Sequence, residues 1–242
     1  MGNINDYTTE YLAGLVCKER VEKSMKYKFE EDRRRSLLAY ALLGYAVSES
    51  TPGISLPVSP IKDELGKPHL YTNTEASAKE EIHFSLSHSG DYAVCVLNDS
   101  PIGIDIESFR ENTDNIAKRF FSPKELKYSK DVPGFFKIWT LKESFMKITG
   151  LGMRLPLDYF YVSDLNNFDG SCKFMTSKTK EELLSDPIIY SHLCPYINDH
   201  SPEFSVNGLC TPFEKSHIIS LAYSPSKNKN IKINTDPVFA KL

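Results

Sequence analysis

The stretch IGIDIE, from Ile102 to Glu107, has the apolar pattern of a buried strand but carries two carboxylates. Side chains alternate between the two faces of a strand, so Asp105 and Glu107 point the same way as Gly103. The three isoleucines point the other way, and we expect them to enter a core. Two carboxylates on one face repel each other, and partial burial increases this cost. We therefore expect a compensating cation close to this strand.

The stretch WTLKESFMK, from Trp139 to Lys147, predicts a helix with one apolar stripe. Glu143 and Lys147 are spaced i,i+4 and fall on the side opposite that stripe. A pair with this spacing contributes only about 0.2–0.5 kcal/mol, so an ordinary amphipathic helix explains it as well as a functional site does. The stripe contains Ile138, Leu141, Phe145 and Ile148.

Together the strand and the helix supply three carboxylates and a lysine. Carboxylate oxygens suit Mg²⁺, which uses one or two carboxylates together with waters and substrate phosphates. A lysine beside them is a compact positive charge for a phosphate oxygen. The alternative for the acidic pair is a solvated strand face. The residues alone leave both interpretations open.

Composition limits the classes of protein to which the chain can belong. Its 242 residues suffice for one large domain or two small ones, and 40% hydrophobic with 25% charged residues is typical of a soluble globular protein. A net charge of -3 argues against a general nucleic-acid binder, and the lack of a run of ~18 apolar residues argues against a membrane span. The five cysteines are scattered without CxxC pairs, and the N-terminus lacks a signal-peptide pattern, so we expect a reduced, cytoplasmic protein.

Hydrophobic periodicity and chain breakers predict a mixture of helices and strands, of the α/β or α+β class. Helices are expected over residues 18–50, before and after a break at Ser122-Pro123, and around Trp139. The helix around Trp139 is expected to follow a loop at Pro133-Gly134 and to end near Gly150 or Gly152. Two strands are expected within residues 81–97, one on each side of a Ser-Gly turn that also allows a short helix. Further strands are expected at 102–107, from 155, and near 171–176, 188–193 and 217–223.

The strand and helix motifs, in this order, resemble the signature of the 4′-phosphopantetheinyl transferases, most closely the surfactin-synthetase-activating (Sfp) type. That signature is a G-[IV]-D strand followed by W-[ST]-x-K-E-[AS]-x-x-K. The order and spacing of its two parts make the resemblance specific. One departure is Ser85, where the family often has asparagine. Further matching segments are GKP at 66–68, SHS at 87–89, IAKRFFS at 116–122 and GLGMRLPLD at 150–158.

The resemblance implies an α/β (α+β) fold of two similar halves related by a pseudo-twofold axis, with a ligand cleft between them. We expect the N-terminal half at residues 1–102, the C-terminal half at 103–224 and a weakly structured tail at 225–242. The implied reaction transfers the 4′-phosphopantetheine arm of coenzyme A to a serine of an acyl or peptidyl carrier protein and releases adenosine 3′,5′-bisphosphate. The implied enzyme is a monomer with no nucleic-acid or membrane partner.

The resemblance also implies roles for the residues of the two motifs. Asp105, Glu107 and Glu143 hold Mg²⁺, with Mn²⁺ as an alternative, against the pyrophosphate of coenzyme A. Glu143 and Lys147 are the implied catalytic residues, and Lys147 contacts the phosphate. Lys142 is either a surface lysine or a second phosphate contact. The base for the serine proton is Glu143, a metal-bound water, or Lys147 with a lowered pKa, and the sequence does not choose among them.

The nucleotide end of coenzyme A needs further cations. The resemblance assigns its phosphates to Lys67, Ser87 and His88. It assigns the 3′-phosphate and the adenine to residues of the N-terminal helical region, for which the candidates are Arg20, Lys23, Arg35 and Ser36. A merely solvated helix face is an equal alternative for Arg20 and Lys23.

The carrier protein is expected to contact residues 108–135, between the two motifs. Phe120 and Phe121 are candidate apolar anchors for the carrier. Carrier proteins are acidic, so Lys124 is a candidate cation beside these anchors. Core packing is an equal alternative for one of the two phenylalanines. The sequence does not choose among fatty-acid, polyketide and peptide-synthetase carriers, although an Sfp-like length favours carriers of secondary metabolism, such as nonribosomal peptide synthesis.

Two other classes of protein share parts of this pattern. A non-catalytic coenzyme A-binding module of the same fold would lack a metal carboxylate or the lysine, and neither is missing. An unrelated Mg²⁺-dependent phosphotransferase would normally show a P-loop, GxxxxGK[ST], and the sequence has none. The sequence therefore predicts a catalytically complete enzyme.

Overall fold

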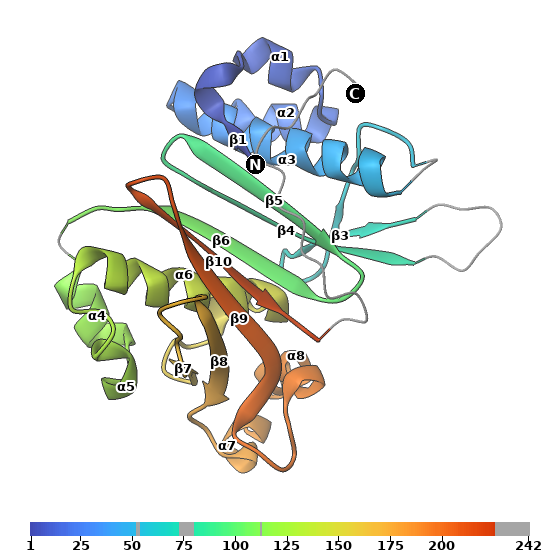
Figure 1. Ribbon diagram of the computed structural model, residues 1–242. Helices are drawn as coiled ribbons and strands as arrows, with labels where there is room; N and C mark the ends of the chain where they lie inside the picture. Colours follow the sequence, from blue (N-terminus) through green and yellow to red (C-terminus); the bar gives the residue numbers. More distant parts are fainter. Residues whose placement is uncertain (52–53, 73–79, 112, 226–242) are drawn as a thin grey trace. The chain divides into compact units, whose positions relative to one another are not determined.

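The computed structural model describes residues 1–51, 54–72, 80–111 and 113–225 (Figure 1). The chain divides into two compact units, Met1–Asp99 and a second unit that begins at Ser100. The predicted division after residue 102 would cut strand β6 (Ile102–Ser108), whereas the observed division precedes this strand. The predicted tail, apart from residue 225, lies outside the described residues. Within the described ranges, no helix has the length and hydropathy that crossing a membrane requires.

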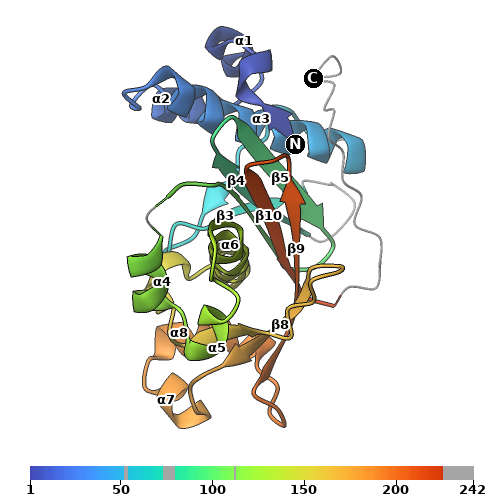
Figure 2. The same cartoon turned by 60° about the vertical axis from the view of Figure 1, so that its left-hand side comes forward.

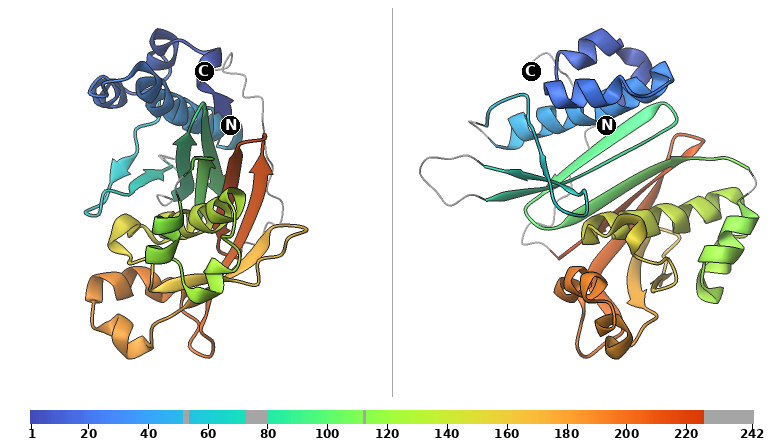
Figure 3. Two further views of the ribbon diagram at one scale, coloured as in Figure 1. Left: turned by 90° about the vertical axis from the view of Figure 1, so that its left-hand side faces the viewer. Right: turned by 180° about the vertical axis from the view of Figure 1, so that it is seen from behind.

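The first unit is a five-stranded antiparallel sheet with the long helix α3 on one face. In both views of Figure 3, α3 (blue) runs along the β4–β5 hairpin. The strand order is β1-β5-β4-β3-β2. Leucines and alanines of α3, such as Leu38 and Leu43, fill the core beneath it. The elements are β1 (Gly2–Asn3), a 3-10 turn (Ile4–Asp6), α1 (Thr9–Ala13), α2 (Lys18–Ser24), α3 (Glu30–Ser50), β2 (Ile61–Lys62), β3 (Pro68–Tyr71), β4 (Glu81–Ser89) and β5 (Tyr92–Asn98).

The second unit is also a five-stranded antiparallel sheet, in the order β6-β10-β9-β8-β7. Its long helix α6, seen nearly end-on in Figure 2, packs against β6 and β10. Phe145 of α6 contacts Phe160, Phe174 and Phe204 from three strands, and this cluster is the centre of the core. After β6 the elements are α4 (Asp114–Phe120), α5 (Pro123–Leu126), α6 (Val132–Thr149), β7 (Phe160–Ser163), β8 (Ser171–Thr176), α7 (Lys180–Leu184), α8 (Pro187–Leu193), β9 (Glu203–Phe213) and β10 (His217–Tyr223).

The two units follow the same plan. In each, a first strand is followed by a helical segment that ends in or contains one long helix, and then by four strands. The first strand pairs with the last one, and the remaining strands continue as an antiparallel meander. The predicted mixed fold with two similar halves is therefore confirmed. The pseudo-twofold axis and the cleft between the halves stay predictions.

Local signals placed several helix ends correctly. Ser122 caps α5 in a capping box with Glu125, as its sequence pattern predicts. Helix α6 ends at Gly150, whose φ of 78° is the left-handed conformation that favours glycine. The loop predicted at Pro133-Gly134 is wrong, because Asp131 caps α6 and accepts a hydrogen bond of 2.7 Å from the Gly134 N–H. A proline in the first helical turn is compatible with such a start.

Three further expectations are wrong for identifiable reasons. The helix predicted over residues 18–50 is two helices, and α3 starts at three acids, 30–32, which stabilise a helix N-terminus. The strand predicted near 188–193 is helix α8, which Asp186 caps and Pro187 begins. The short helix allowed at the Ser-Gly turn is absent from the described residues, since β4 continues to Ser89 and Gly90 turns the chain.

Strand β6 and helix α6 come unusually close at Gly103. A Cβ placed on Gly103 would lie 2.0 Å from the Ser144 carbonyl oxygen and 2.9 Å from the Ile148 nitrogen. Only glycine permits this approach, because the contacting atoms are helix backbone and have little freedom to move. The glycine of the strand motif therefore sets the distance between the two elements that carry the predicted site.

We predict that Gly103→Ala destabilises the fold by at least about 3 kcal/mol, because the methyl group overlaps the α6 backbone. Urea unfolding followed by circular dichroism measures the change. The control is Gly44→Ala in helix α3, whose added Cβ has only the Leu56 side chain nearby, at 3.9 Å. It should be neutral or up to about 1 kcal/mol stabilising. Equal effects of the two substitutions would show that the contact at Gly103 is not restrictive.

A buried ion pair connects α5, α6 and β7. Lys142 and Glu125 are both 0% exposed, and Lys142 Nζ lies 2.8 Å from Glu125 Oε1 and 2.8 Å from the Phe160 carbonyl oxygen. Glu125 also accepts hydrogen bonds from the Val162 N–H (2.9 Å) and the Ser122 N–H (2.8 Å). Burial lowers the pKa of Lys142, and the attraction of Glu125 opposes that shift. The pair is thus satisfied by partners on three elements.

We predict that Lys142→Met costs about 3–5 kcal/mol, because it leaves the Glu125 carboxylate buried without a cation. The double variant Lys142→Met with Glu125→Gln should be more stable than the single Lys142→Met variant, because the unpaired charge is removed as well. Urea denaturation of the wild type, both single variants and the double variant gives the coupling energy. Strict additivity of the two substitutions would contradict a direct pair.

Candidate functional site

The acidic face of β6 is turned toward helix α6. Asp105 is paired across the sheet with Ser220 of β10, and paired residues point to the same face. The Ser220 hydroxyl lies 2.6 Å from the Thr140 hydroxyl of α6, so the face that Ser220 shares with Asp105 is the face that packs against α6. Gly103 and Glu107 share that face with Asp105. The alternation read from the sequence therefore places both carboxylates beside the helix that carries the second motif.

Lys147 of α6 is the cation that the acidic strand requires. Its Nζ donates hydrogen bonds to Asp105 Oδ1 at 2.7 Å and to the Ile104 carbonyl oxygen at 2.9 Å. Both acceptors lie on β6, so the lysine is held by the strand rather than extended into solvent. The prediction that a cation compensates the acidic pair is met by the lysine of the second motif.

Glu143 lies within electrostatic reach of both strand carboxylates. Its pKa is raised to about 7, first by burial and then by the negative charge of Asp105, with Lys147 opposing the shift and Glu107 adding to it. These influences act only over short distances in a partly buried site. The structure therefore brings the four residues predicted from the two motifs into one charged cluster, which we call the acidic cluster: Asp105, Glu107, Glu143 and Lys147.

The acidic cluster has the donor chemistry of a divalent-cation site. Carboxylate oxygens are the ligands that Mg²⁺ prefers. Across residues 1–51, 54–72, 80–111 and 113–225, however, no group of three or more His, Cys, Asp or Glu side chains is gathered closely enough to hold a metal ion. Lys147 is bonded to Asp105 instead, and Arg110 lies 3.3 Å from Glu107 Oε2. Arg110 was not among the predicted residues, although it follows the strand by only a few positions.

The phosphate role allowed for Lys142 is contradicted by its position. The side chain points into the core of the second unit, where it pairs with Glu125. No phosphate can reach an ammonium group that is 0% exposed and already bonded. The two lysines of the second motif therefore have different roles: Lys142 is structural, and Lys147 belongs to the acidic cluster.

In the first unit, helices α2 and α3 bring two predicted residues together. Arg20 of α2 donates a hydrogen bond of 3.1 Å to the Ser36 hydroxyl of α3. The Arg20 guanidinium also lies 3.4 Å from the centre of the Tyr40 ring, a stacked cation–π contact. Arg20 is therefore held by contacts with α3 and does not lie on a merely solvated face of α2.

Lys23 is one turn farther along α2 and meets a lysine that sequence reasoning missed. Lys62 of β2 is close enough for its positive charge to act on Lys23. The pKa of Lys23 is lowered, first by burial and then by Lys62 and Arg20. Lys62 stands alone in a loop-like stretch of the sequence, and no local pattern marks it as a neighbour of α2.

The remaining predicted residues of the first unit are dispersed. Arg35 is engaged within the protein, with Asp32 at 2.7 Å and the Gly90 carbonyl oxygen at 2.6 Å. Ser87 and His88 are consecutive on β4 and point to opposite faces, so the strand separates them. Lys67 is half-buried, and this burial lowers its pKa, while the charges of the nearby acids Glu81 and Asp63 oppose that shift.

The segment expected to contact a carrier protein contains one core residue and two surface residues. Phe121 is buried and stacks on Phe135 of α6 at 5.2 Å between ring centres, so of the two interpretations offered for it the structure favours core packing over an anchor role. Phe120 is half-buried beside Arg119. Lys124 is on the surface and donates a hydrogen bond of 2.9 Å to the Tyr161 hydroxyl.

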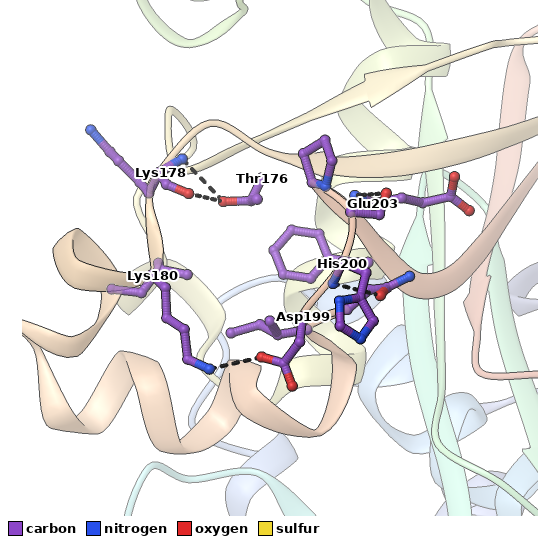
Figure 4. A pocket seen from close by; sticks show the side chains of 12 residues that line it. Thr176, Lys178, Lys180, Asp199, His200 and Glu203 are labelled. Atoms are coloured by element: carbon purple, nitrogen blue, oxygen red, sulfur yellow. Dashed lines mark hydrogen bonds and ion pairs between the residues drawn. The ribbon is translucent and has the colours of Figure 1, made fainter.

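A cavity of about 360 Å³ lies elsewhere in the second unit, between α7 and the ends of β8 and β9 (Figure 4). Lys180 points toward Asp199 across it, with 2.7 Å between Nζ and Oδ1. Glu203, on its rim, is paired with Lys173 at 2.8 Å. None of the predicted site residues is in its lining. Because its charged groups neutralise one another, the acidic cluster remains the better candidate site.

Comparison with known proteins supports the resemblance found in the sequence. A family model described as the 4′-phosphopantetheinyl transferase superfamily matches residues 101–190. A second, described as the N-terminal part of 4′-phosphopantetheinyl transferase, matches residues 6–99. The two matches meet at the division between the two units.

Several curated relatives bear the same description. A 4′-phosphopantetheinyl transferase of Bacillus subtilis is 38% identical over 163 residues, which are 62% of this chain and 67% of the relative. The 4′-phosphopantetheinyl transferase Sfp of Bacillus subtilis (strain 168) is 35% identical over 159 residues, 63% of this chain and 68% of the relative. The 4′-phosphopantetheinyl transferase gsp of Aneurinibacillus migulanus is 32% identical over 168 residues, 66% of each chain. On these matches, and with the two motifs meeting at the acidic cluster, the chain belongs to the 4′-phosphopantetheinyl transferase superfamily, Sfp type.

Proposed function

We propose that this protein transfers the 4′-phosphopantetheine arm of coenzyme A to a serine of an acyl or peptidyl carrier protein and releases adenosine 3′,5′-bisphosphate. One observation carries the proposal: Lys147 of the helix motif is bonded to Asp105 of the strand motif, with Glu143 within electrostatic reach. Membership of the superfamily, whose relatives are named for this transfer, supports it.

In the proposed step, the serine Oγ forms a bond to the phosphorus next to the pantetheine. The bond between this phosphorus and the bridging oxygen breaks, and the electron pair leaves on that oxygen as part of adenosine 3′,5′-bisphosphate. The serine proton passes to a base, for which the ionised carboxylate of Glu143 is the candidate on the chain. Lys147 is fixed by two acceptors on β6, so its positive charge is in position before negative charge develops on the phosphate.

The acidic cluster is the proposed site of Mg²⁺, with Mn²⁺ as the alternative. Asp105, Glu107 and Glu143 are the residues that would hold the ion, and their oxygens are suitable ligands. When bound, such an ion would neutralise charge on the pyrophosphate. Burial, and after it the negative charges of Asp105 and Glu107, raise the pKa of Glu143, and a bound cation would reduce this cost of ionisation.

The proposed carrier contact is the surface around Phe120 and Lys124. A half-buried aromatic ring beside cations suits an acidic helix that presents a serine. We further propose a cytoplasmic monomer, in keeping with five free cysteines and a net charge of -3. Carriers of secondary metabolism, including peptide synthetases, are the proposed physiological partners.

We predict that the protein adds the arm to at least one apo carrier when fatty-acid, polyketide and peptide-synthetase carriers are each incubated with coenzyme A and Mg²⁺. Mass spectrometry of the carrier measures the reaction. Glu143→Gln should lower the rate at least ~100-fold, because it removes a charge from the acidic cluster. A chelator should stop the wild-type reaction, and added Mg²⁺ or Mn²⁺ should restore it.

The matched control is Glu181→Gln, which removes the same charge from an exposed position on α7 of the second unit. It should leave the rate unchanged. No modification of any carrier would defeat the proposed function. A Glu143→Gln variant as fast as the wild type would instead defeat the assignment of Glu143.

We predict that Glu143→Gln stabilises the metal-free protein at pH 8 by about 2–3 kcal/mol and has little effect near pH 5. In the folded protein the Glu143 pKa is about 7, against 4.5 as the ordinary value. The ionised form is therefore disfavoured by folding, and the penalty grows as the pH rises from 4.5 to 7. Urea unfolding at both pH values, with chelator present, measures the difference. A loss of stability at pH 8 would show that the carboxylate is not crowded by its neighbours.

A further inference from the structure

The last turn of α6 carries Lys147, and the carbonyl groups at this end of the helix need partners. The last four carbonyls of an α-helix have no N–H group of the next helical turn to accept from. In α6 they belong to Met146, Lys147, Ile148 and Thr149. Ile148 and Thr149 are buried, so their carbonyls must find partners within the protein. The way in which this helix end is closed therefore bears on the position of Lys147.

Two of the four carbonyls are satisfied locally. The Thr149 hydroxyl donates a hydrogen bond of 2.9 Å to the Met146 carbonyl oxygen. The Gly150 N–H donates one of 3.3 Å to the Lys147 carbonyl oxygen. Neither contact reaches the carbonyls of Ile148 and Thr149, which depend on another part of the chain.

The other two partners come from α8 and from the 3-10 turn that follows it, Cys194–Tyr196. The Tyr196 hydroxyl donates a hydrogen bond of 3.2 Å to the Ile148 carbonyl oxygen. His192 Nδ1 lies 2.9 Å from the Thr149 carbonyl oxygen, and it carries the hydrogen of this contact because a carbonyl oxygen only accepts. We call His192 and Tyr196 the cap residues. They lie 43 and 48 positions after the carbonyls that they bond.

The segment that carries the cap residues is fixed independently of these two hydrogen bonds. Leu193, next to His192, is buried, and so is the Tyr196 side chain. Ile197 forms a β-bridge with Phe204 of β9, whose ring lies 5.0 Å from that of Phe145 between centres. The cap residues are thus attached to the core of the second unit, and they can hold the end of α6 in place.

Lys147 is consequently held at both of its ends. Its Nζ is bonded to Asp105 and to the Ile104 carbonyl oxygen of β6. Its backbone belongs to the helical turn that the cap residues close. Helix ends fray, and a displacement of about 1 Å at a reacting site can cost about 10²-fold in rate. Closing the last turn of α6 therefore matters for the chemistry as well as for the fold.

We propose that His192 and Tyr196 are positioning residues for Lys147: by bonding the last two carbonyls of α6, they keep the turn that carries this lysine helical and in register with β6. The catalytic part of the inference rests on the proposed function, in which Lys147 acts on the phosphate. Neither cap residue touches the reacting atoms. Both lie outside the two signature motifs and beyond residue 190, where the match to the superfamily model ends.

The kinetic test is the transfer assay with Tyr196→Phe, which removes only the hydroxyl group. We expect kcat to fall about tenfold, because Lys147 loses its fixed position, and KM for coenzyme A to stay within about threefold. His192→Ala should lower kcat to a similar extent. His192→Asn, whose amide N–H can replace Nδ1 as the donor, should recover most of the loss. Circular dichroism verifies that each variant is folded.

The matched control is Tyr190→Phe on the same helix as His192. It removes the same hydroxyl group at a position from which, within the described residues, no hydrogen bond reaches α6. It should leave kcat and KM unchanged.

A double-mutant cycle separates positioning of Lys147 from a general structural role. In a Lys147→Met background, Tyr196→Phe should lower kcat by less than about twofold, because the residue through which it acts is already gone. An equal loss of about tenfold in both backgrounds would overturn the proposal. Tyr196→Phe and His192→Ala variants that are as fast as the wild type would overturn it too.

Amide hydrogen exchange tests the cap residues without relying on turnover. In Tyr196→Phe, the amides of residues 147–150 should exchange at least about fivefold faster than in the wild type, while those of residues 135–141 should be unchanged. Unchanged exchange at 147–150 would overturn the proposal and leave the proposed function in place. A wild type that modifies no carrier would overturn the proposed function, whereas faster exchange at 147–150 would still support the role of the cap residues in closing α6.

Discussion

At Gly103 the backbone of α6 lies so close to β6 that no side chain fits between them. Within the described parts of the chain, β6 is the edge strand of its sheet and pairs with β10 on one side only, so the helix is its main support on the acidic face. The same approach lets Lys147 reach two acceptors on the strand. Without it, Asp105 and Glu107 would have no cation from the helix, and the cost of placing two acids on one partly buried face would be uncompensated. The packing of the second unit and the chemistry of the acidic cluster therefore depend on one glycine.

The features that the sequence predicts correctly are those that follow a local rule. Alternation along β6 places Asp105 with Glu107, and the capping box at Ser122 and the left-handed Gly150 mark helix ends. Each of these depends on residues a few positions apart. The capping signal at Asp186-Pro187 is equally local, and the expected strand there is wrong because this cap starts a helix despite the short apolar run that follows it.

The features that the sequence cannot supply depend on contacts between distant residues. Nothing near Lys142 indicates that its partner is Glu125, which also has to satisfy two backbone N–H groups. The influence of Lys62 on Lys23 joins two residues that are 39 positions apart in the chain. Lys142 and Lys147 belong to one nine-residue motif, yet one is enclosed in the core and the other faces the strand. The presence of a residue in a sequence motif therefore does not show whether its role is to stabilise the fold or to take part in the chemistry of the site.

The pairing of β6 with β10 also bears on how the chain is made. Residues 102–108 find their partner at 217–223, so more than a hundred residues of intervening chain must be synthesised before the ladder can close. Until then, the strand with the two acids is an unpaired edge in a nascent chain, where unsatisfied backbone groups invite contact with other chains. Its two negative charges oppose such contacts, as charged residues do on other strand edges. The two carboxylates of this strand therefore place negative charge on the edge that stays unpaired longest while the chain is synthesised.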